Sequence, residues 1–223
     1  MRTVLIRKAA IFDMDGTLFD AWPLALKAYE ETFARLQKEG YNPPPLPSED
    51  VLKAQLGKTY DAMWSELIPG RSLSFYELAD RWMFEYEEAL IKRGYGRLFP
   101  DVIPVLETLV ARGFHLFVAS NGRESYIQMI VERFGLTHYF TDLYSAGRFG
   151  TRSKVDLVRH LITTYPAPLQ VMIGDRRSDV EAGQANDLYV VGCLYGYGGV
   201  EELEKADTHI TTLMELLDVP LLR

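Results

Sequence analysis

Two aspartates, Asp13 and Asp15, follow a short apolar run and are separated by one residue. On an extended backbone alternate side chains share a face, so we expect both carboxylates to point into one pocket. Their repulsion would be severe unless a divalent cation lay between them or one of them held a proton. A metal-neutralised Asp13 could attack phosphorus, while Asp15 could protonate the leaving oxygen and later deprotonate water. The pair therefore favours phosphoryl transfer through a covalent phospho-aspartate.

Two further polar clusters follow apolar runs later in the chain. Ser120-Asn121-Gly122 comes after residues 114–119, and a cluster from Gly174 to Asp179 comes after residues 169–173. Ligands of open α/β sheets bind at the carboxyl ends of strands, so three clusters at three such ends are expected to converge. Oxygen ligands suit a hard ion, which makes Mg²⁺ the natural candidate. The expected metal ligands are Asp13, Asp15 and Asp175, and the expected phosphate-binding donors are Thr17, Ser120, Asn121 and Lys154.

Each of these features also has a plain structural explanation. An Asp-x-Asp-Gly-Thr segment is often a turn with an Asx hydrogen bond, Ser-Asn-Gly is often a tight turn, and Gly-Asp after a strand often caps a helix. A lysine such as Lys154 is usually a solvated surface residue. The acidic run Glu85-Tyr86-Glu87-Glu88 is most simply a solvated helix face. It is the order of the clusters and their shared place at strand ends that favour a site.

The apolar pattern predicts the elements that position these residues. Short apolar runs alternate with segments of helical period, which is typical of a parallel sheet with crossover helices. Between about Asp20 and Arg97 the strand signal disappears and apolar residues recur at helical spacing, which predicts a helical insertion. Asp101 is expected to cap the helix that follows. The predicted strands cover residues 9–12, 114–119, 169–173 and 188–191, and the predicted helical stretches cover residues 22–36, 51–56, 60–67 and 75–91.

The composition limits the classes of partner. The 223 residues carry 24 Lys and Arg against 31 Asp and Glu, a net charge of −7, which gives no general attraction to nucleic acid or to an anionic membrane. Cys193 is the only cysteine, and no stretch approaches the roughly 20 apolar residues of a membrane helix. We therefore expect a soluble cytoplasmic protein that binds a small phosphorylated metabolite, with no nucleic acid polymer and no membrane as partner. The oligomeric state cannot be predicted.

Four ordered segments resemble the motifs of the haloacid dehalogenase superfamily. They are Ile11–Leu18, Ser120-Asn121-Gly122, Lys154, and Gly174–Asp179. The resemblance implies a Rossmann-like parallel sheet with helices on both faces and an inserted all-helical cap. The core would comprise residues 1–19 and 98–223, and the cap residues 20–97. The insertion resembles the cap of the branch that holds phosphoglycolate phosphatase and β-phosphoglucomutase.

The resemblance also assigns roles to individual residues. Asp13 would be the nucleophile and Asp15 the general acid and base. Ser120 and Lys154 would bind the phosphoryl group, assisted by Asn121 and Thr17. Asp13, Asp175 and the backbone carbonyl of Asp15 would bind Mg²⁺. Asp179 would not bind the ion directly but would lie next to these ligands and assist them. Gly57 and Lys58 resemble a specificity loop that reaches from the cap to the substrate.

Two departures from the family pattern qualify these assignments. Lys154 is not followed by the proline that many relatives carry, so Arg148 or Arg152 could share its role. Arg176 stands where threonine is common, and we expect Arg176 and Arg177 to point outward or form salt bridges.

The leading functional prediction is a magnesium-dependent phosphomonoester hydrolase. Its substrate would be a small metabolite such as phosphoglycolate, a sugar phosphate or a nucleoside monophosphate. The first alternative is a β-phosphoglucomutase-like phosphotransferase, which Thr17 disfavours because mutases often carry a bulkier apolar residue there. A dehalogenase would have no use for Asp15 or the metal. A non-enzymatic receiver-like phosphate-binding domain would not carry a cap of this size.

Overall fold

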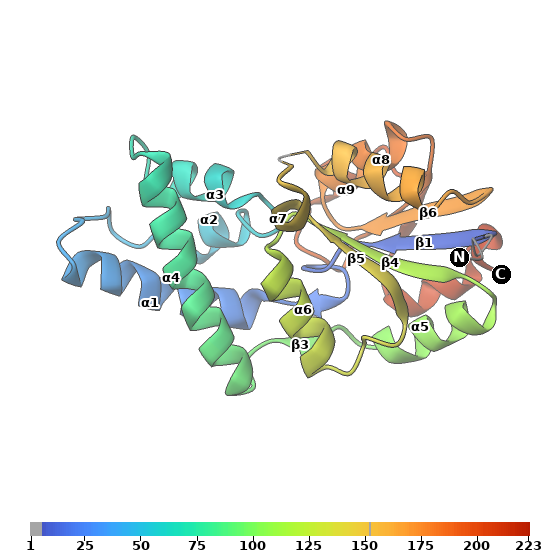
Figure 1. The fold of residues 1–223 in the computed structure, drawn as a ribbon, viewed down its shortest axis with the longest axis horizontal. Helices are drawn as coiled ribbons and strands as arrows, with labels where there is room; N and C mark the ends of the chain where they lie inside the picture. The colour runs from blue at the N-terminus through green and yellow to red at the C-terminus, as the bar shows by residue number, and fades with distance from the viewer. Residues whose placement is uncertain (1–5, 152) are drawn as a thin grey trace.

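The computed structural model describes residues 6–151 and 153–223. Its centre is a six-stranded sheet in which all neighbouring strands run parallel, in the order β5-β4-β1-β6-β7-β8 (Figure 1). The strands are β1 (Lys8–Phe12), β4 (His115–Ser120), β5 (Phe140–Ser145), β6 (Leu169–Gly174), β7 (Tyr189–Cys193) and β8 (Thr208–Ile210). The predicted α/β fold class is confirmed.

Helices cover both faces of the sheet, as Figure 1 shows. Ala10 and Phe12 of β1 pack in the same cluster as residues of α5 (Val102–Ala111) and α6 (Glu124–Arg133), whereas Ala9 and Ile11 pack with residues of α8 (Lys154–Thr164) and α9 (Arg177–Gln184). Because successive residues of a strand face opposite sides, a strand segment buried on both sides must be apolar throughout, as residues 9–12 of β1 are. The helices of the core are α5 (Val102–Ala111), α6 (Glu124–Arg133), α7 (Ala146–Phe149), α8 (Lys154–Thr164), α9 (Arg177–Gln184) and α10 (Val200–Leu203), followed by the 3₁₀ helices η1 (Leu213–Asp218) and η2 (Pro220–Leu222).

Four helices form a separate cap beside the sheet, at the left of Figure 1. They are α1 (Trp22–Lys38), α2 (Glu49–Lys53), α3 (Tyr60–Leu67) and α4 (Leu73–Lys92). The chain enters and leaves this cap through a short antiparallel ribbon, in which β2 (Phe19–Asp20) pairs with β3 (Arg97–Leu98). The predicted all-helical cap is therefore present. The domain boundaries at 19/20 and 97/98 fall within the ribbon and stay a prediction.

Two local expectations differ from the structure. Strands β5 and β8 were not predicted, because β5 has half-exposed positions and β8 has only three residues. Asp101 lies at the N-cap of α5, but its backbone is left-handed with φ 65° and its side chain makes no capping hydrogen bond, so the predicted side-chain cap is wrong. Among the described residues, no helix is long and apolar enough to cross a membrane.

Candidate active site

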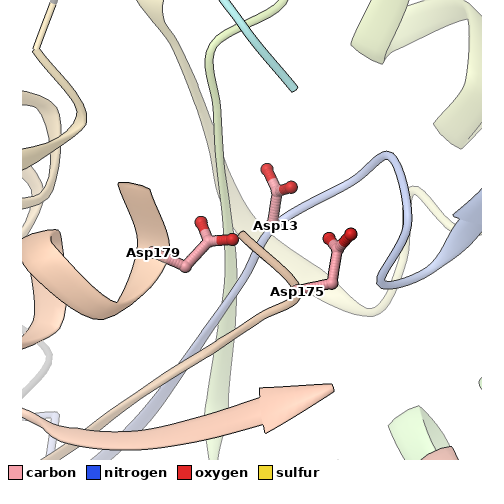
Figure 2. Close-up of side chains that lie close together, drawn as sticks. All are labelled: Asp13, Asp175 and Asp179. Carbon is pink, nitrogen blue, oxygen red and sulfur yellow. The ribbon is translucent and has the colours of Figure 1, made fainter. Parts of the chain in front are cut away.

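The order of the strands brings distant acidic residues together at the carboxyl edge of the sheet. From β1 the chain continues to β4 and β5 on one side, and it then returns to β6 on the other side of β1. Asp13 follows β1, Asp175 follows β6, and Asp179 lies in the first turn of α9. Carboxylate oxygens from these three residues all lie within 4.8 Å of one another, and all three residues are buried (Figure 2).

A single buried lysine partly balances this acidic cluster. Lys154 is the first residue of α8, whose start is fixed by the Ser153 side chain accepting a hydrogen bond from the backbone of Asp156. Its Nζ lies 2.6 Å from Oδ1 of Asp13 and also forms an ion pair with Asp179. Burial by itself would lower the pKa of Lys154, but the two carboxylates raise it above its ordinary value. Lys154 is therefore a cation at the centre of the site.

Asp175 is held by groups from both ends of the chain. The Thr17 hydroxyl donates to its Oδ1 at 3.1 Å, and the backbone N–H of Tyr197 donates to its Oδ2 at 2.7 Å. Gly16 has φ 90° and lies so close to the Asp175 carboxylate that a Cβ would overlap it. Thr17 thus positions Asp175 in this structure, and its contact with phosphate stays a prediction.

Asp15 does not belong to the group of three clustered carboxylates. Its Oδ1 accepts a hydrogen bond of 2.9 Å from the hydroxyl of Tyr126 on α6. Burial, together with the negative charge of Asp13, raises the pKa of Asp15 to about 7. A carboxyl with that pKa can give and take a proton near neutral pH, as a general acid and base must.

Ser120 and Asn121 lie at the end of β4, beside the acidic cluster in the sheet order. The Ser120 hydroxyl is buried and accepts a hydrogen bond from the backbone of Gly122. Asn121 donates from its side-chain amide to the carbonyl of Gly57 in the cap, at 2.8 Å, so it joins the core to the cap loop. Its own side-chain oxygen is buried with no hydrogen-bond partner among the described residues.

A cavity of about 480 Å³ lies between the cap and the core. Asp15 and Asn121 line it from the core, and Gly57 and Lys58 line it from the cap. Lys58 forms an ion pair of 2.7 Å with Glu66. The predicted specificity loop therefore reaches the cavity that contains Asp15, while its role in specificity stays a prediction.

The acidic cluster fits a hard divalent cation. Asp13, Asp175 and Asp179 bring three carboxylates against the one ammonium of Lys154, and Oδ2 of Asp13 is buried without a hydrogen-bond partner in the described part of the chain. Burial, then the charges of Asp13 and Asp179, raise the pKa of Asp175 well above its ordinary value. Burial likewise raises the pKa of Asp179 to about 6, and Lys154 opposes that rise. A bound cation would relieve this excess of negative charge.

A family model described as haloacid dehalogenase-like hydrolase matches residues 10–193. The chain belongs to the haloacid dehalogenase-like hydrolases. This confirms the resemblance carried by the four motifs. It also supports the expectation that the chain is a phosphatase, since several relatives of this hydrolase carry that name.

Curated relatives of the hydrolase include proteins of two activities. It is 29% identical over 204 residues to a phosphoglycolate phosphatase of Haemophilus influenzae, covering 83% of this chain and 85% of that protein. It is 28% identical over 213 residues to the tyrosine-protein kinase PtkA of Mycobacterium tuberculosis, covering 93% of this chain and 69% of that protein. A haloacid dehalogenase-like hydrolase from Bacteroides fragilis has the same fold, with a TM-score of 0.82, 22% identity, and coverage of 94% of this chain and 99% of that one.

The arginines of this hydrolase lie at different places around the site. Arg176 forms a salt bridge with Glu202, as expected, and also donates to the cap carbonyl of Leu56 at 2.8 Å, which was not expected. Arg177 is exposed. Arg148 pairs with Asp142 at 2.8 Å on the surface, and it forms no hydrogen bond or ion pair with the described residues Lys154 and Asp13. The suggested role of Arg152 falls outside the described residues.

Three groups that face the cavity of this hydrolase were not predicted from the sequence. Tyr126 binds Asp15, and Arg123 forms an ion pair with Asp80 of the cap. Glu87 lines the cavity instead of belonging to a solvated face, so that reading of the acidic run was wrong for this residue. Neither Tyr126 nor Arg123 lies in a recognisable motif. The helical spacing of Glu87 from Asp80, seven residues, was the available signal.

Proposed function

We propose that this hydrolase is a magnesium-dependent phosphomonoesterase that acts on a small phosphorylated metabolite through a phospho-aspartate at Asp13. The observation that carries the proposal is the pairing of two unlike carboxylates. Asp13 is buried against Lys154, whereas Asp15 has a pKa of about 7 and lines the cavity. One residue thus suits nucleophilic attack and the other suits proton transfer.

In the first step an Asp13 carboxylate oxygen attacks phosphorus. The bond between phosphorus and the leaving oxygen breaks, and Asp15 gives its proton to that oxygen. In the second step water attacks phosphorus, Asp15 takes the proton from the water, and the bond to Asp13 breaks. Lys154 and Ser120 would hold the phosphoryl oxygens during both steps, assisted by Asn121 and Thr17.

The proposed protein ligands of Mg²⁺ are Asp13, Asp175 and the backbone carbonyl of Asp15. Asp179, which pairs with Lys154, would keep that lysine in place and add negative charge beside the ion. When bound, Mg²⁺ would reduce the repulsion between the phosphoryl group and the carboxylates. The chain's relatives named phosphoglycolate phosphatase support a small substrate, and a cytoplasmic location remains part of the proposal.

The test is phosphate release from a panel of phosphorylated metabolites with Mg²⁺. Asp13→Asn should lower the rate at least about a thousandfold, because it removes the nucleophile. Asp156→Asn is the control, since Asp156 is exposed and its described ion pair is with Arg159 on α8. Full activity of Asp13→Asn with an unchanged circular dichroism spectrum would refute the assignment of Asp13 as the nucleophile.

The same assay separates the alternative reactions. A mutase would convert β-glucose 1-phosphate to glucose 6-phosphate in the presence of a trace of bisphosphate, without net release of phosphate. A receiver-like domain would bind Mg²⁺ and turn over none of the esters.

A further inference from the structure

The cavity has an acidic wall that the proposed chemistry does not use. Glu77, Asp80 and Glu87 lie on α4 at positions i, i+3 and i+10, which places them on one face of the helix. All three line the cavity, together with Phe84 from the same face. Asp15 lines the same cavity, so the leaving group of a substrate would lie between the catalytic acid and this wall.

The described cations of the cavity lining already have partners. Lys58 pairs with Glu66, and Arg123 pairs with Asp80. Glu87 has neither a hydrogen bond nor an ion pair with any residue in 6–151 or 153–223. It is the acidic group of the wall that remains available to a ligand inside the cavity, since Asp80 pairs with Arg123 and Glu77 is exposed to solvent.

The surroundings of Glu87 disfavour additional negative charge. Burial, followed by the charges of Asp80 and Asp15, raises the pKa of Glu87 well above its ordinary value. Burial, followed by Glu87, also raises the pKa of Tyr29 on the facing helix α1. The part of this effect that comes from the charges of Asp80 and Asp15 would also act against a second anion, whereas it would favour a cation, and Arg123 opposes it.

We infer that Glu87 selects the leaving group, and that the preferred substrates are phosphomonoesters whose leaving alcohol carries an ammonium group and no carboxylate. A hydroxyl in the same place would bind less strongly, because it offers a hydrogen bond without a charge. This inference rests on the proposed phosphatase function and narrows it. The preference runs against phosphoglycolate, the substrate in the name of several relatives.

Three esters of similar size test the inference: 2-aminoethyl phosphate, 2-hydroxyethyl phosphate and phosphoglycolate. They place an ammonium, a hydroxyl and a carboxylate next to the same kind of phosphate. We expect kcat/KM to fall in that order, by about tenfold or more between the first and the last. A difference of this size corresponds to one interaction between the charge of Glu87 and the charge of the leaving group, partly screened by solvent. Glu87→Gln should reduce this ratio about tenfold.

Glu88→Gln is the matched control. It removes the same charge one position along α4, where Glu88 pairs with Lys92 outside the cavity, and it should leave the ratio unchanged. A ratio near one in the unaltered protein, or an equal ratio in Glu87→Gln, would overturn the inference.

Calorimetric titration of the three esters into the Asp13→Asn variant with Mg²⁺ tests the role of Glu87 separately from the phosphatase function. The ratio of dissociation constants reports the preference of the cavity even where nothing is hydrolysed. Absence of hydrolysis of every ester, including 4-nitrophenyl phosphate, would refute the phosphatase function. Tighter binding of phosphoglycolate than of 2-aminoethyl phosphate would refute the role of Glu87.

Discussion

Removing one hydroxyl group, with Tyr126→Phe, tests whether Asp15 is the proton donor. The Tyr126 hydroxyl donates to Oδ1 of Asp15 at 2.9 Å and lowers the pKa of Asp15, against the larger effect of burial. A hydrogen bond to a charged group contributes about 1.5–3 kcal/mol, and one pKa unit corresponds to about 1.4 kcal/mol. Because water would replace part of the lost bond, we expect the pKa of Asp15 to rise by about one unit.

The sign of the kinetic effect follows from the role of Asp15. The leaving oxygen receives a proton only while Asp15 is protonated, so kcat/KM should decline as the pH rises through the pKa of Asp15 in the free enzyme. In Tyr126→Phe this decline should therefore occur about one unit higher in pH. The assay is the pH dependence of kcat/KM for 2-hydroxyethyl phosphate, whose alkoxide leaving group needs a proton, at one fixed Mg²⁺ concentration.

Tyr139→Phe provides the control for this substitution. Tyr139 donates its hydroxyl to Glu107 at 3.0 Å on the exposed surface, far in sequence from the acidic cluster. Tyr139→Phe should leave the pH dependence of kcat/KM unchanged. A Tyr126→Phe profile that does not move, or that moves to lower pH, would refute the assignment of Asp15 as the acid.

Three further outcomes follow from the site. Without metal, the free energy of unfolding should fall as pH rises from about 4 to 7. In the folded protein the pKa of Asp15 is about 7 and the pKa of Asp179 is about 6, both above the ordinary 3.8. The folded protein therefore binds more protons than the unfolded chain over this range, and it loses stability as they dissociate. Denaturant titration at several pH values would show it, and adding Mg²⁺ should restore more stability at pH 8 than at pH 5. Lys154→Met should destabilise the metal-free protein by about 3–5 kcal/mol, since it leaves the paired carboxylates uncompensated; an unchanged denaturation midpoint would contradict the pairing. Arg176→Ala should lower kcat/KM about tenfold by removing the hydrogen bond to the cap, whereas Arg177→Ala should have no effect.

The sheet could be predicted because its central strands are buried on both faces. The runs that became β1, β4, β6 and β7 are almost purely apolar, and polar residues mark where β1, β4 and β6 end. The strand β5 was not predicted because it lies at the edge of the sheet and pairs with a single neighbour, β4. Four of its six residues are only partly buried or exposed. A strand at an edge needs no continuous apolar run, so its sequence resembles a loop.

The centre of the site was predictable to a similar degree, and its outer part was not. Asp13, Asp175 and Lys154 could be placed together because they lie at strand ends or at a helix start in a known order. The wall residue Glu87 could not be placed, because an acidic residue on an amphipathic helix looks the same whether it faces bulk solvent or an internal cavity. Only the packing of α4 against α1 and α6 shows which side Glu87 faces.

The ribbon formed by β2 and β3 lets the cap vary independently of the sheet. Both junctions lie next to each other, with Phe19 paired to Leu98 and Asp20 paired to Arg97. An insert whose two ends are neighbours can be lengthened, shortened or exchanged without rethreading any strand. Enzymes that share this core can therefore differ in substrate range through changes in the cap alone, while the residues of the reaction centre stay the same.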